Sequence, residues 1–210
     1  MIQDNTSQPT MTSFIKDLPN LCSLAGLFCS TLAIYFAIQG NFAAGIIGIL
    51  WAVVFDWADG IIARKMGNRT KHQSEFGGQL DSLIDIVSFG VFPAVFLLSY
   101  GEYSLWFIPG AFLVLAASAI RLSYFNIFGL CSKNTYIGLA LDNNVIILAM
   151  VFLLESLIPH ATFSIVIYAV MMILMVLNIA PIKTPKLAGR WFYVLIIYSI
   201  VMSIIFGMKL

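Results

Sequence analysis

The residues of this sequence best placed to do chemistry are four aspartates in the stretch DWADGIIARKMGNRTKHQSEFGGQLDSLID, which runs from position 56 to 85. Asp56 and Asp59 lie at the end of one apolar run, and Asp81 and Asp85 lie at the start of the next. If both runs are helical, each pair occupies one helix face, and two antiparallel helices joined by a short loop would turn the pairs towards each other. Clustered carboxylate oxygens select hard cations, so Mg²⁺ or Mn²⁺, with Ca²⁺ as a further occupant, is expected in preference to zinc. The spacing therefore predicts that the four aspartates hold two divalent cations.

The neighbours of these aspartates favour phosphate chemistry. Each aspartate costs about 2.5–3.5 kcal/mol at the centre of a membrane helix, and close anions also repel one another, so bound cations are needed to offset both effects. Two adjacent divalent cations form a clamp for displacement at phosphorus. Gly60 and Gly77 leave room for a phosphate or nucleotide near the helix backbone, and Arg64 can offer its planar guanidinium to a phosphate. A structural polar network, or a row of charges facing water, would tolerate irregular spacing.

The elements that position these residues are expected to be membrane-spanning helices. The chain has 210 residues, of which 60% are hydrophobic and 10% are charged, whereas a soluble domain carries roughly a quarter charged residues. Runs of about twenty apolar residues cross a bilayer, and such runs lie near 21–39, 43–63, 78–99, 104–125, 138–158, 162–180 and 191–208. The sequence therefore predicts an all-α, polytopic transmembrane helical bundle. A cytosolic lead is expected over residues 1–18, and a single transmembrane catalytic domain over 19–210.

The positions of lysine and arginine predict how the bundle faces. With these spans, ten of the eleven basic residues fall on the side of the N-terminus, and only Lys209 falls on the other. The first side is therefore expected to be cytosolic, in the cytoplasmic membrane of a prokaryote, with the active site at its surface. Lys16, Lys183 and Lys186 are interpreted as topology signals without a further role.

The aspartate stretch resembles the signature of the CDP-alcohol phosphotransferase family, D-x2-D-G-x2-A-R followed after a spacer by G-x3-D-x3-D. Every fixed position is filled here, by Asp56, Asp59, Gly60, Ala63, Arg64, Gly77, Asp81 and Asp85. The resemblance implies transfer of a phosphate-bearing group from a CDP-linked donor to an alcohol, with release of CMP. It also implies that all four aspartates bind metal, that Asp81 and Asp85 are catalytic and that Asp85 is the general base. The residues implied for the CDP site are Asp59, Gly60, Ala63, Arg64, Ser74 and Gly77. A six-helix transmembrane core and a homodimer are expected, with the last span as an addition to that core.

Other segments resemble the branch of integral-membrane phosphatidylserine synthases. They include LDSLIDIVSFGVFPAVF at 80–96, IRLSYFN at 120–126 and the tetrapeptide at 74–77. This resemblance implies that CDP-diacylglycerol and L-serine give phosphatidylserine and CMP, among membrane lipids and without a nucleic-acid partner. Arg121 would then hold the donor phosphate or the serine carboxylate. The alternative for Arg121 is an interfacial arginine that extends to the membrane surface.

Two departures from the family pattern bear on the acceptor. The spacer between Arg64 and Gly77, KMGNRTKHQSEF, is longer than the roughly eight residues of the signature. In YIGLALDNNVI, the polar residues Asp142, Asn143 and Asn144 stand where serine synthases carry apolar residues and proline. They could read a different acceptor, or they could cap a helix, because Asp and Asn favour that position. Choline, inositol, inositol phosphate and glycerol phosphate therefore remain alternative acceptors. A cation transporter is a further alternative, although the sequence shows no internal repeat of the kind many transporters carry.

Overall fold

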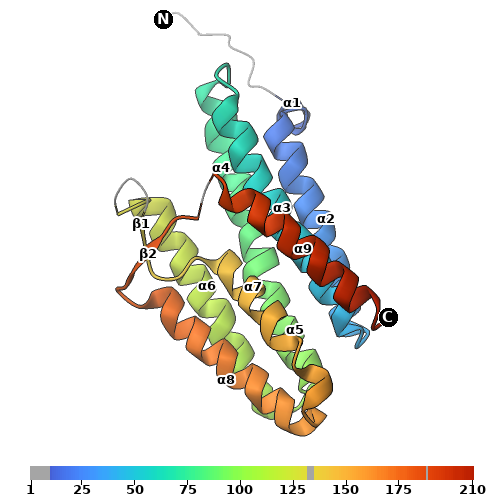
Figure 1. Ribbon diagram of the computed structural model, residues 1–210. Coiled ribbons are helices and arrows are strands. Elements are labelled where there is room, and N and C mark those ends of the chain that lie inside the picture. The colour runs from blue at the N-terminus through green and yellow to red at the C-terminus, as the bar shows by residue number, and fades with distance from the viewer. Residues whose placement is uncertain (1–9, 132–134, 188) are drawn as a thin grey trace, which may run out of the picture.

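The computed structural model describes residues 10–131, 135–187 and 189–210 as a helical bundle with one small strand pair at its side (Figure 1). Residues 1–9 of the expected lead, and Lys133, lie outside the described residues. The helices are α1 (Met11–Ile15), α2 (Leu18–Ile38), α3 (Phe42–Lys65), α4 (Lys71–Asp85), the π-helix η1 (Ile86–Val91), α5 (Phe92–Tyr100), the 3₁₀ turn η2 (Leu105–Phe107), α6 (Ile108–Phe128), α7 (Leu141–Phe152), the 3₁₀ turn η3 (Glu155–Leu157), α8 (His160–Ile179) and α9 (Trp191–Gly207). The strands are β1 (Thr135–Ile137) and β2 (Lys183–Pro185).

Five helices of the described chain are long and apolar enough to cross a membrane. They are α2, α3, the continuous helix from Lys71 to Tyr100, the helix from Leu105 to Phe128, and α8. The chain is therefore a multi-pass integral membrane protein of helical fold, which confirms the fold class predicted from composition.

Of the other two expected spans, the one at 138–158 is much shorter than predicted, and the one at 191–208 agrees with α9 to within one residue. In place of 138–158, α7 has 12 residues, about 18 Å at 1.5 Å per residue, and α9 has 17 residues. The α7 helix starts late because the backbone is left-handed at Gly138, which follows β1, and it ends early because the chain turns at Leu153 and Leu154. Hydropathy alone could not separate this half-length helix from a full span.

The long spacer between the two aspartate-bearing helices is anchored rather than loose. Its Arg69 donates from Nε and Nη2 to Asp17 Oδ2, at 2.9 and 2.7 Å. The next residue, Thr70, begins α4 through a capping box: its hydroxyl accepts from Gln73 N, and the Gln73 side chain accepts from Thr70 N. Phe14 of α1 stacks on Phe76 of α4, with ring centroids 4.5 Å apart. The spacer thus ties the N-terminal segment to the helix that carries Asp81 and Asp85.

Changing Arg69 to methionine should lower the thermal stability of the protein in detergent. The side chains of Arg69 and Asp17 are only 11% and 2% exposed, so the change leaves a buried carboxylate without its cation. Loss of one partner of a buried pair costs about 3–5 kcal/mol. The double change Arg69→Met with Asp17→Asn should recover part of the loss.

The matched control is Lys71→Met, which removes an exposed pair with Glu75 at 3.7 Å. Exposed pairs contribute little to stability. An equal decrease in melting temperature for Lys71→Met and Arg69→Met would contradict the anchoring role of Arg69.

The helices next to the aspartates pack through small residues. A Cβ added to Gly48 of α3 would lie 3.1 Å from Ala33 Cβ and 3.1 Å from the Cys29 carbonyl oxygen of α2. Small residues let membrane helices approach closely, where lipid provides no hydrophobic drive for association. The α2–α3 contact therefore holds Asp56 and Asp59 in a fixed register.

Aromatic side chains close the opposite end of the bundle. Phe96, Tyr100, Phe152 and Phe163 are all buried, and they come from α5, α7 and α8. The ring centroids of Phe96 and Phe152 lie 5.6 Å apart, and those of Tyr100 and Phe163 lie 5.7 Å apart.

The strand pair β1–β2 joins two segments far apart in the chain. The strands are antiparallel, with Tyr136 opposite Thr184. Gly138 follows β1 with φ +77°, and a Cβ there would lie 2.1 Å from the Asn178 carbonyl oxygen. Only glycine fits both the left-handed backbone and this close approach. The pairing brings the start of α7 and the segment after β2 to one side of the bundle.

Candidate active site

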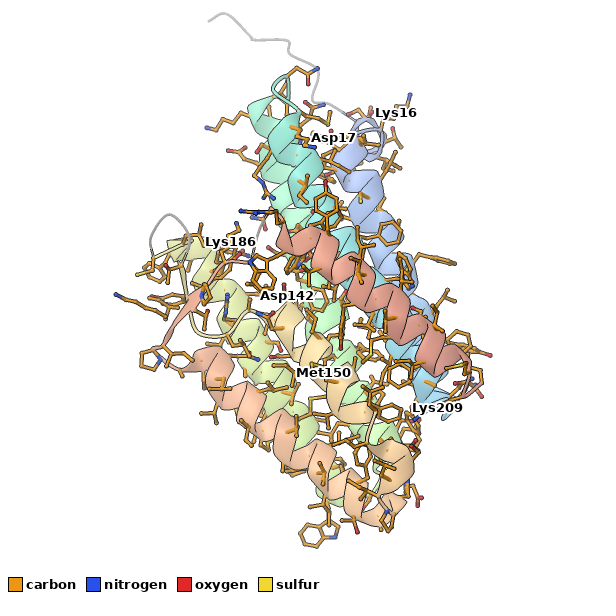
Figure 2. The ribbon with its side chains drawn as sticks, viewed as in Figure 1. Lys16, Asp17, Asp142, Met150, Lys186 and Lys209 are labelled. Atoms are coloured by element: carbon orange, nitrogen blue, oxygen red, sulfur yellow. The ribbon has the colours of Figure 1, made fainter. Side chains whose placement is uncertain are left out.

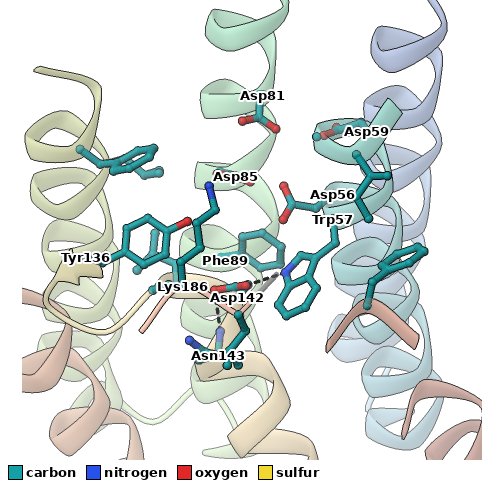
Figure 3. A pocket seen from close by; sticks show the side chains of 18 of the residues that line it. Asp56, Trp57, Asp59, Asp81, Asp85, Phe89, Tyr136, Asp142, Asn143 and Lys186 are labelled. Carbon is teal, nitrogen blue, oxygen red and sulfur yellow. Dashed lines mark hydrogen bonds between the residues drawn. The ribbon is translucent and has the colours of Figure 1, made fainter. Parts of the chain in front are cut away.

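A cavity of about 290 Å³ lies between α3, α4, α6, α7 and the segment after β2 (Figure 3). Residues from most of the expected site line it, namely Asp56, Asp59, Gly60, Arg64, Asp81, Asp85 and Arg121. Ala63, Ser74 and Gly77 are not among the lining residues, although they lie on α3 and α4. The cavity therefore collects most of the signature from two helices, as predicted from its spacing.

Three of the four aspartates form a compact group. Asp56 of α3 and Asp81 and Asp85 of α4 each offer an oxygen, and these oxygens lie within 4.8 Å of one another. Asp85 Oδ1 is buried and has no hydrogen-bond partner among the described residues. Three carboxylates this close repel one another unless positive charge lies between them. An oxygen donor set with an unsatisfied buried atom suits a hard divalent cation.

Asp59 lines the same cavity but is not a member of this compact group. It is 6% exposed, and its Oδ2 accepts a short hydrogen bond from the Ser23 hydroxyl of α2. Figure 3 shows Asp59 on α3, beside Asp56 and across the cavity from Asp81. Ser23 was not singled out from the sequence, because a serine in an apolar run carries no signal of its partner.

A π-helix follows the last aspartate. It begins at Ile86, directly after Asp85, and interrupts the α-helical repeat as far as Val91. Ser88 within it is buried and shares a 2.6 Å hydrogen bond with Ser30 of α2, while Phe89 lines the cavity. Short π segments inside α-helices are often found at functional sites. Here the π segment is tied to α2, and this holds the C-terminal end of α4 in place.

The two signature glycines have different neighbours. A Cβ at Gly60 would lie 3.2 Å from Arg64 Nη1, so the arginine folds back over this glycine beside the cavity. A Cβ at Gly77 would lie 2.6 Å from Arg69 Nη2 and 3.0 Å from Asn20 Oδ1. Gly77 therefore makes room for the spacer arginine, a contact that was not anticipated from the signature.

Arg121 is buried at the cavity wall rather than extended to a membrane surface. It is 6% exposed, and its Nε donates to the Leu139 carbonyl oxygen at 3.1 Å. Its guanidinium carbon lies 5.6 Å from the Phe125 ring centroid and 5.4 Å from that of Tyr136. Two aromatic rings and a backbone carbonyl therefore hold the Arg121 side chain beside the cavity.

Lys186 corrects the interpretation that it serves only as a topology signal. It is half-buried, lines the cavity, and places Nζ 5.8 Å from the Tyr136 ring centroid (Figure 3). Burial lowers the pKa of Lys186, and the neighbouring Arg64 lowers it further. Burial also raises the pKa of Tyr136 to about 12, with a contribution from the Asp142 carboxylate. The pairing of β1 with β2 brings Tyr136 and Lys186 together, and no local pattern marks either residue.

The polar trio at the start of α7 does not cap that helix through its side chains. The N-cap residue is Ala140, and Asp142 lies in the first turn. Asp142 Oδ2 accepts from Trp57 Nε1 at 2.7 Å, and its Oδ1 accepts from Asn143 N at 3.0 Å. Asp142 and Asn143 line the cavity, whereas Asn144 is buried. The capping alternative is therefore not what the structure shows.

The sequence is similar to a known protein family over most of its length. A family model described as CDP-alcohol phosphatidyltransferase matches residues 16–208. An archaetidylserine synthase of Methanothermobacter thermautotrophicus is 33% identical over 85% of this chain and 73% of its own length. A CDP-diacylglycerol–serine O-phosphatidyltransferase of Methanocaldococcus jannaschii is 32% identical over 75% of this chain and 71% of its own. A CDP-diacylglycerol–glycerol-3-phosphate 3-phosphatidyltransferase of Aquifex aeolicus is 35% identical over 42% of this chain and 45% of its own.

Proposed function

Because this chain belongs to the CDP-alcohol phosphatidyltransferase family, a family of transferases in phospholipid biosynthesis, we propose that it transfers a phosphatidyl group from CDP-diacylglycerol to L-serine. The products are phosphatidylserine and CMP. The observation that carries the proposal is the group formed by Asp56, Asp81 and Asp85, whose oxygens lie within 4.8 Å at a cavity that also holds basic side chains.

The donor set suits a hard divalent cation, and the proposal places two Mg²⁺ or Mn²⁺ ions there. Asp56, Asp81 and Asp85 supply converging carboxylate oxygens, Asp85 Oδ1 lacks a partner within the described chain, and Asp59 lies at the same cavity. These four residues would hold the ions. When bound, the ions supply the positive charge that neutralises the pyrophosphate of the donor.

The residues of the chain position the reactants and move one proton. Arg64, folded over Gly60, binds a donor phosphate beside the CDP moiety. Asp85 takes the proton of the serine hydroxyl, whose oxygen attacks the phosphorus that carries the lipid. The bond from this phosphorus to the bridging oxygen of CMP breaks, and CMP leaves towards the cytosol. Catalysis of this kind depends mainly on positioning and charge neutralisation.

The charges around the cavity support an acceptor without net charge. The aspartates at 56, 59, 81, 85 and 142 face the basic side chains of Arg64, Arg121 and Lys186. The carboxylates exceed the basic side chains by two negative charges. Two divalent cations change this to two positive charges, and the two negative charges of the donor pyrophosphate balance them. A zwitterionic serine leaves the site neutral, whereas glycerol phosphate or inositol phosphate adds negative charge with no basic partner left. The two serine enzymes described above cover 85% and 75% of this chain, whereas the glycerol-phosphate enzyme covers 42%, which supports the same choice.

The membrane arrangement is part of the proposal. The N-terminus and the cavity face the cytosol, and the acyl chains of the donor remain in the bilayer. Figure 2 shows Lys16 and Lys209 at opposite ends of the bundle, and Lys209 lies 3.8 Å from Glu155. Residues 1–18 form a cytosolic lead, residues 19–210 form one catalytic domain, and the chain works as a homodimer.

The test is CMP release by the purified protein from CDP-diacylglycerol with Mg²⁺ or Mn²⁺. Serine, choline, inositol, inositol phosphate and glycerol phosphate are offered separately, and an archaetidyl donor is tried beside the diacylglycerol donor. Release that depends on serine is expected. Release only with another alcohol would refute the acceptor. If no donor and acceptor together give CMP release, and liposomes that carry the protein take up cations, the protein is a transporter and not an enzyme.

A further inference from the structure

One carboxylate of the cavity belongs to neither the signature nor the compact aspartate group. Asp142 reaches the cavity from α7, facing Asp56 and Asp85 of the other helices (Figure 3). One of its oxygens accepts from Trp57 Nε1 at 2.7 Å, and the other accepts from Asn143 N at 3.0 Å. These two neutral donors hold the carboxylate in one orientation. Each oxygen keeps a lone pair for a further donor.

No lysine or arginine nitrogen of the described part of the chain lies within 4.0 Å of Asp142, and the charge of Arg121 acts on it only from a greater distance. A carboxylate that is largely removed from water and has no cation in direct contact is costly. The nearest basic groups of the cavity, Arg121 and Lys186, are instead placed around the Tyr136 ring, at 5.4 and 5.8 Å from its centroid. The cavity therefore presents an oriented anion on one side and two cations on another, an arrangement that matches a zwitterion.

We propose that Asp142, oriented by Trp57, binds the ammonium group of the acceptor and so selects an alcohol that carries an amine. The inference rests on the proposed function, because it places the acceptor in the same cavity as the donor. Asp142 is then the specificity-determining residue, and Trp57 is a positioning residue that acts through it. An amino alcohol would then place its ammonium at Asp142 and its hydroxyl at the aspartate group that lines the same cavity.

The test compares two acceptors that differ only in the amine. L-Serine has the ammonium, and 3-hydroxypropionate keeps the alcohol and the carboxylate without it. Asp142→Asn should raise the KM for serine by about 10- to 100-fold, as expected for loss of a desolvated charge contact, with a much smaller change in kcat. The same change should not weaken CMP release with 3-hydroxypropionate, and it should raise this release, because the anionic acceptor then meets one negative charge fewer.

A matched pair of tryptophan variants tests the positioning role. Trp57→Phe keeps an aromatic ring and removes the donor to Asp142, and it should raise the KM for serine by several fold. Trp51→Phe on the same helix removes a donor to Ser203 Oγ at 3.2 Å, outside the cavity, and should leave this KM unchanged. If the two variants raise the KM for serine equally, Trp57 does not position Asp142.

Two binding measurements separate this inference from the proposed reaction. Mn²⁺ binding, followed by electron paramagnetic resonance, should be the same in Asp142→Asn as in the wild type; a loss would assign Asp142 to the metal ligands and overturn the inference. Binding of radiolabelled serine is measured without donor. If the wild type binds serine, Asp142→Asn binds it more weakly and neither releases CMP, then the proposed reaction is wrong and the role of Asp142 is supported. If the wild type binds no serine, or if Asp142→Asn weakens both acceptors equally, the inference fails.

Discussion

Changing Asp85 to asparagine should lower the rate of CMP release by about a thousandfold or more. Loss of a general base alone costs about 10²- to 10⁴-fold, and this change also removes a carboxylate from the group within 4.8 Å. Because an amide cannot accept the proton of the acceptor hydroxyl, added substrate should not restore the rate. The measurement is the initial rate of CMP release at saturating serine and Mn²⁺.

Stability measurements distinguish loss of chemistry from loss of folding in this variant. Without divalent cations, Asp85→Asn should melt at a higher temperature than the wild type, since one of the repelling carboxylates is gone. Mn²⁺ should raise the melting temperature of the wild type markedly and that of the variant less.

The control is Glu102→Gln, which changes a carboxylate whose side chain is 82% exposed and which lies outside the cavity. It should keep both the rate of CMP release and the response of the melting temperature to Mn²⁺. An Asp85→Asn protein that retains a tenth of the wild-type rate would rule out Asp85 as the base.

Changing Gly138 to alanine should destabilise the protein by several kcal/mol. An alanine at φ +77° costs about 1–2 kcal/mol for its backbone alone. The added Cβ would also lie 2.1 Å from the Asn178 carbonyl oxygen, so β1 or the end of α8 must move. Because β1 carries Tyr136 and leads to Asp142, activity at a permissive temperature should fall as well. The expected readouts are a large decrease in melting temperature in detergent and a higher KM for serine.

Gly40→Ala provides the matched comparison. Gly40 also has a left-handed backbone, with φ +75°, but a Cβ there meets no atom within 4 Å. Its decrease in melting temperature should therefore reflect the backbone cost alone and be clearly smaller, with an unchanged KM. Equal decreases for the two variants would show that the contact with Asn178 has no energetic effect.

Much of the site could be predicted from the sequence because its signature is local. The signature aspartates, Gly60 and Arg64 lie on two adjacent helices, and a helical repeat with a short connection is enough to bring their faces together. The family and the helical membrane fold follow from the same local information, namely residue types at fixed spacing and long apolar runs. What remained undecided from the signature was the acceptor, because the residues beside it come from other parts of the chain.

Hydropathy did not predict the length of α7. A run of apolar residues at 138–158 reads as a span, yet α7 has only 12 residues, because the left-handed backbone at Gly138 delays its start and the turn at Leu153 ends it. The π segment after Asp85 was likewise not foreseen, since it is fixed by the bond between Ser88 and Ser30 of another helix.

By itself, then, the sequence determined the membrane helices, the family and the aspartate signature, since each depends on residues close together in the chain. Only the tertiary structure decided that Trp57 would orient Asp142, that Lys186 would join Tyr136 at the cavity and that Ser23 would donate a hydrogen bond to Asp59. These contacts link segments separated by tens of residues. Their partners are set by how the helices pack and by the register of β1 on β2, and neither quantity is encoded in a local period of polar and apolar residues.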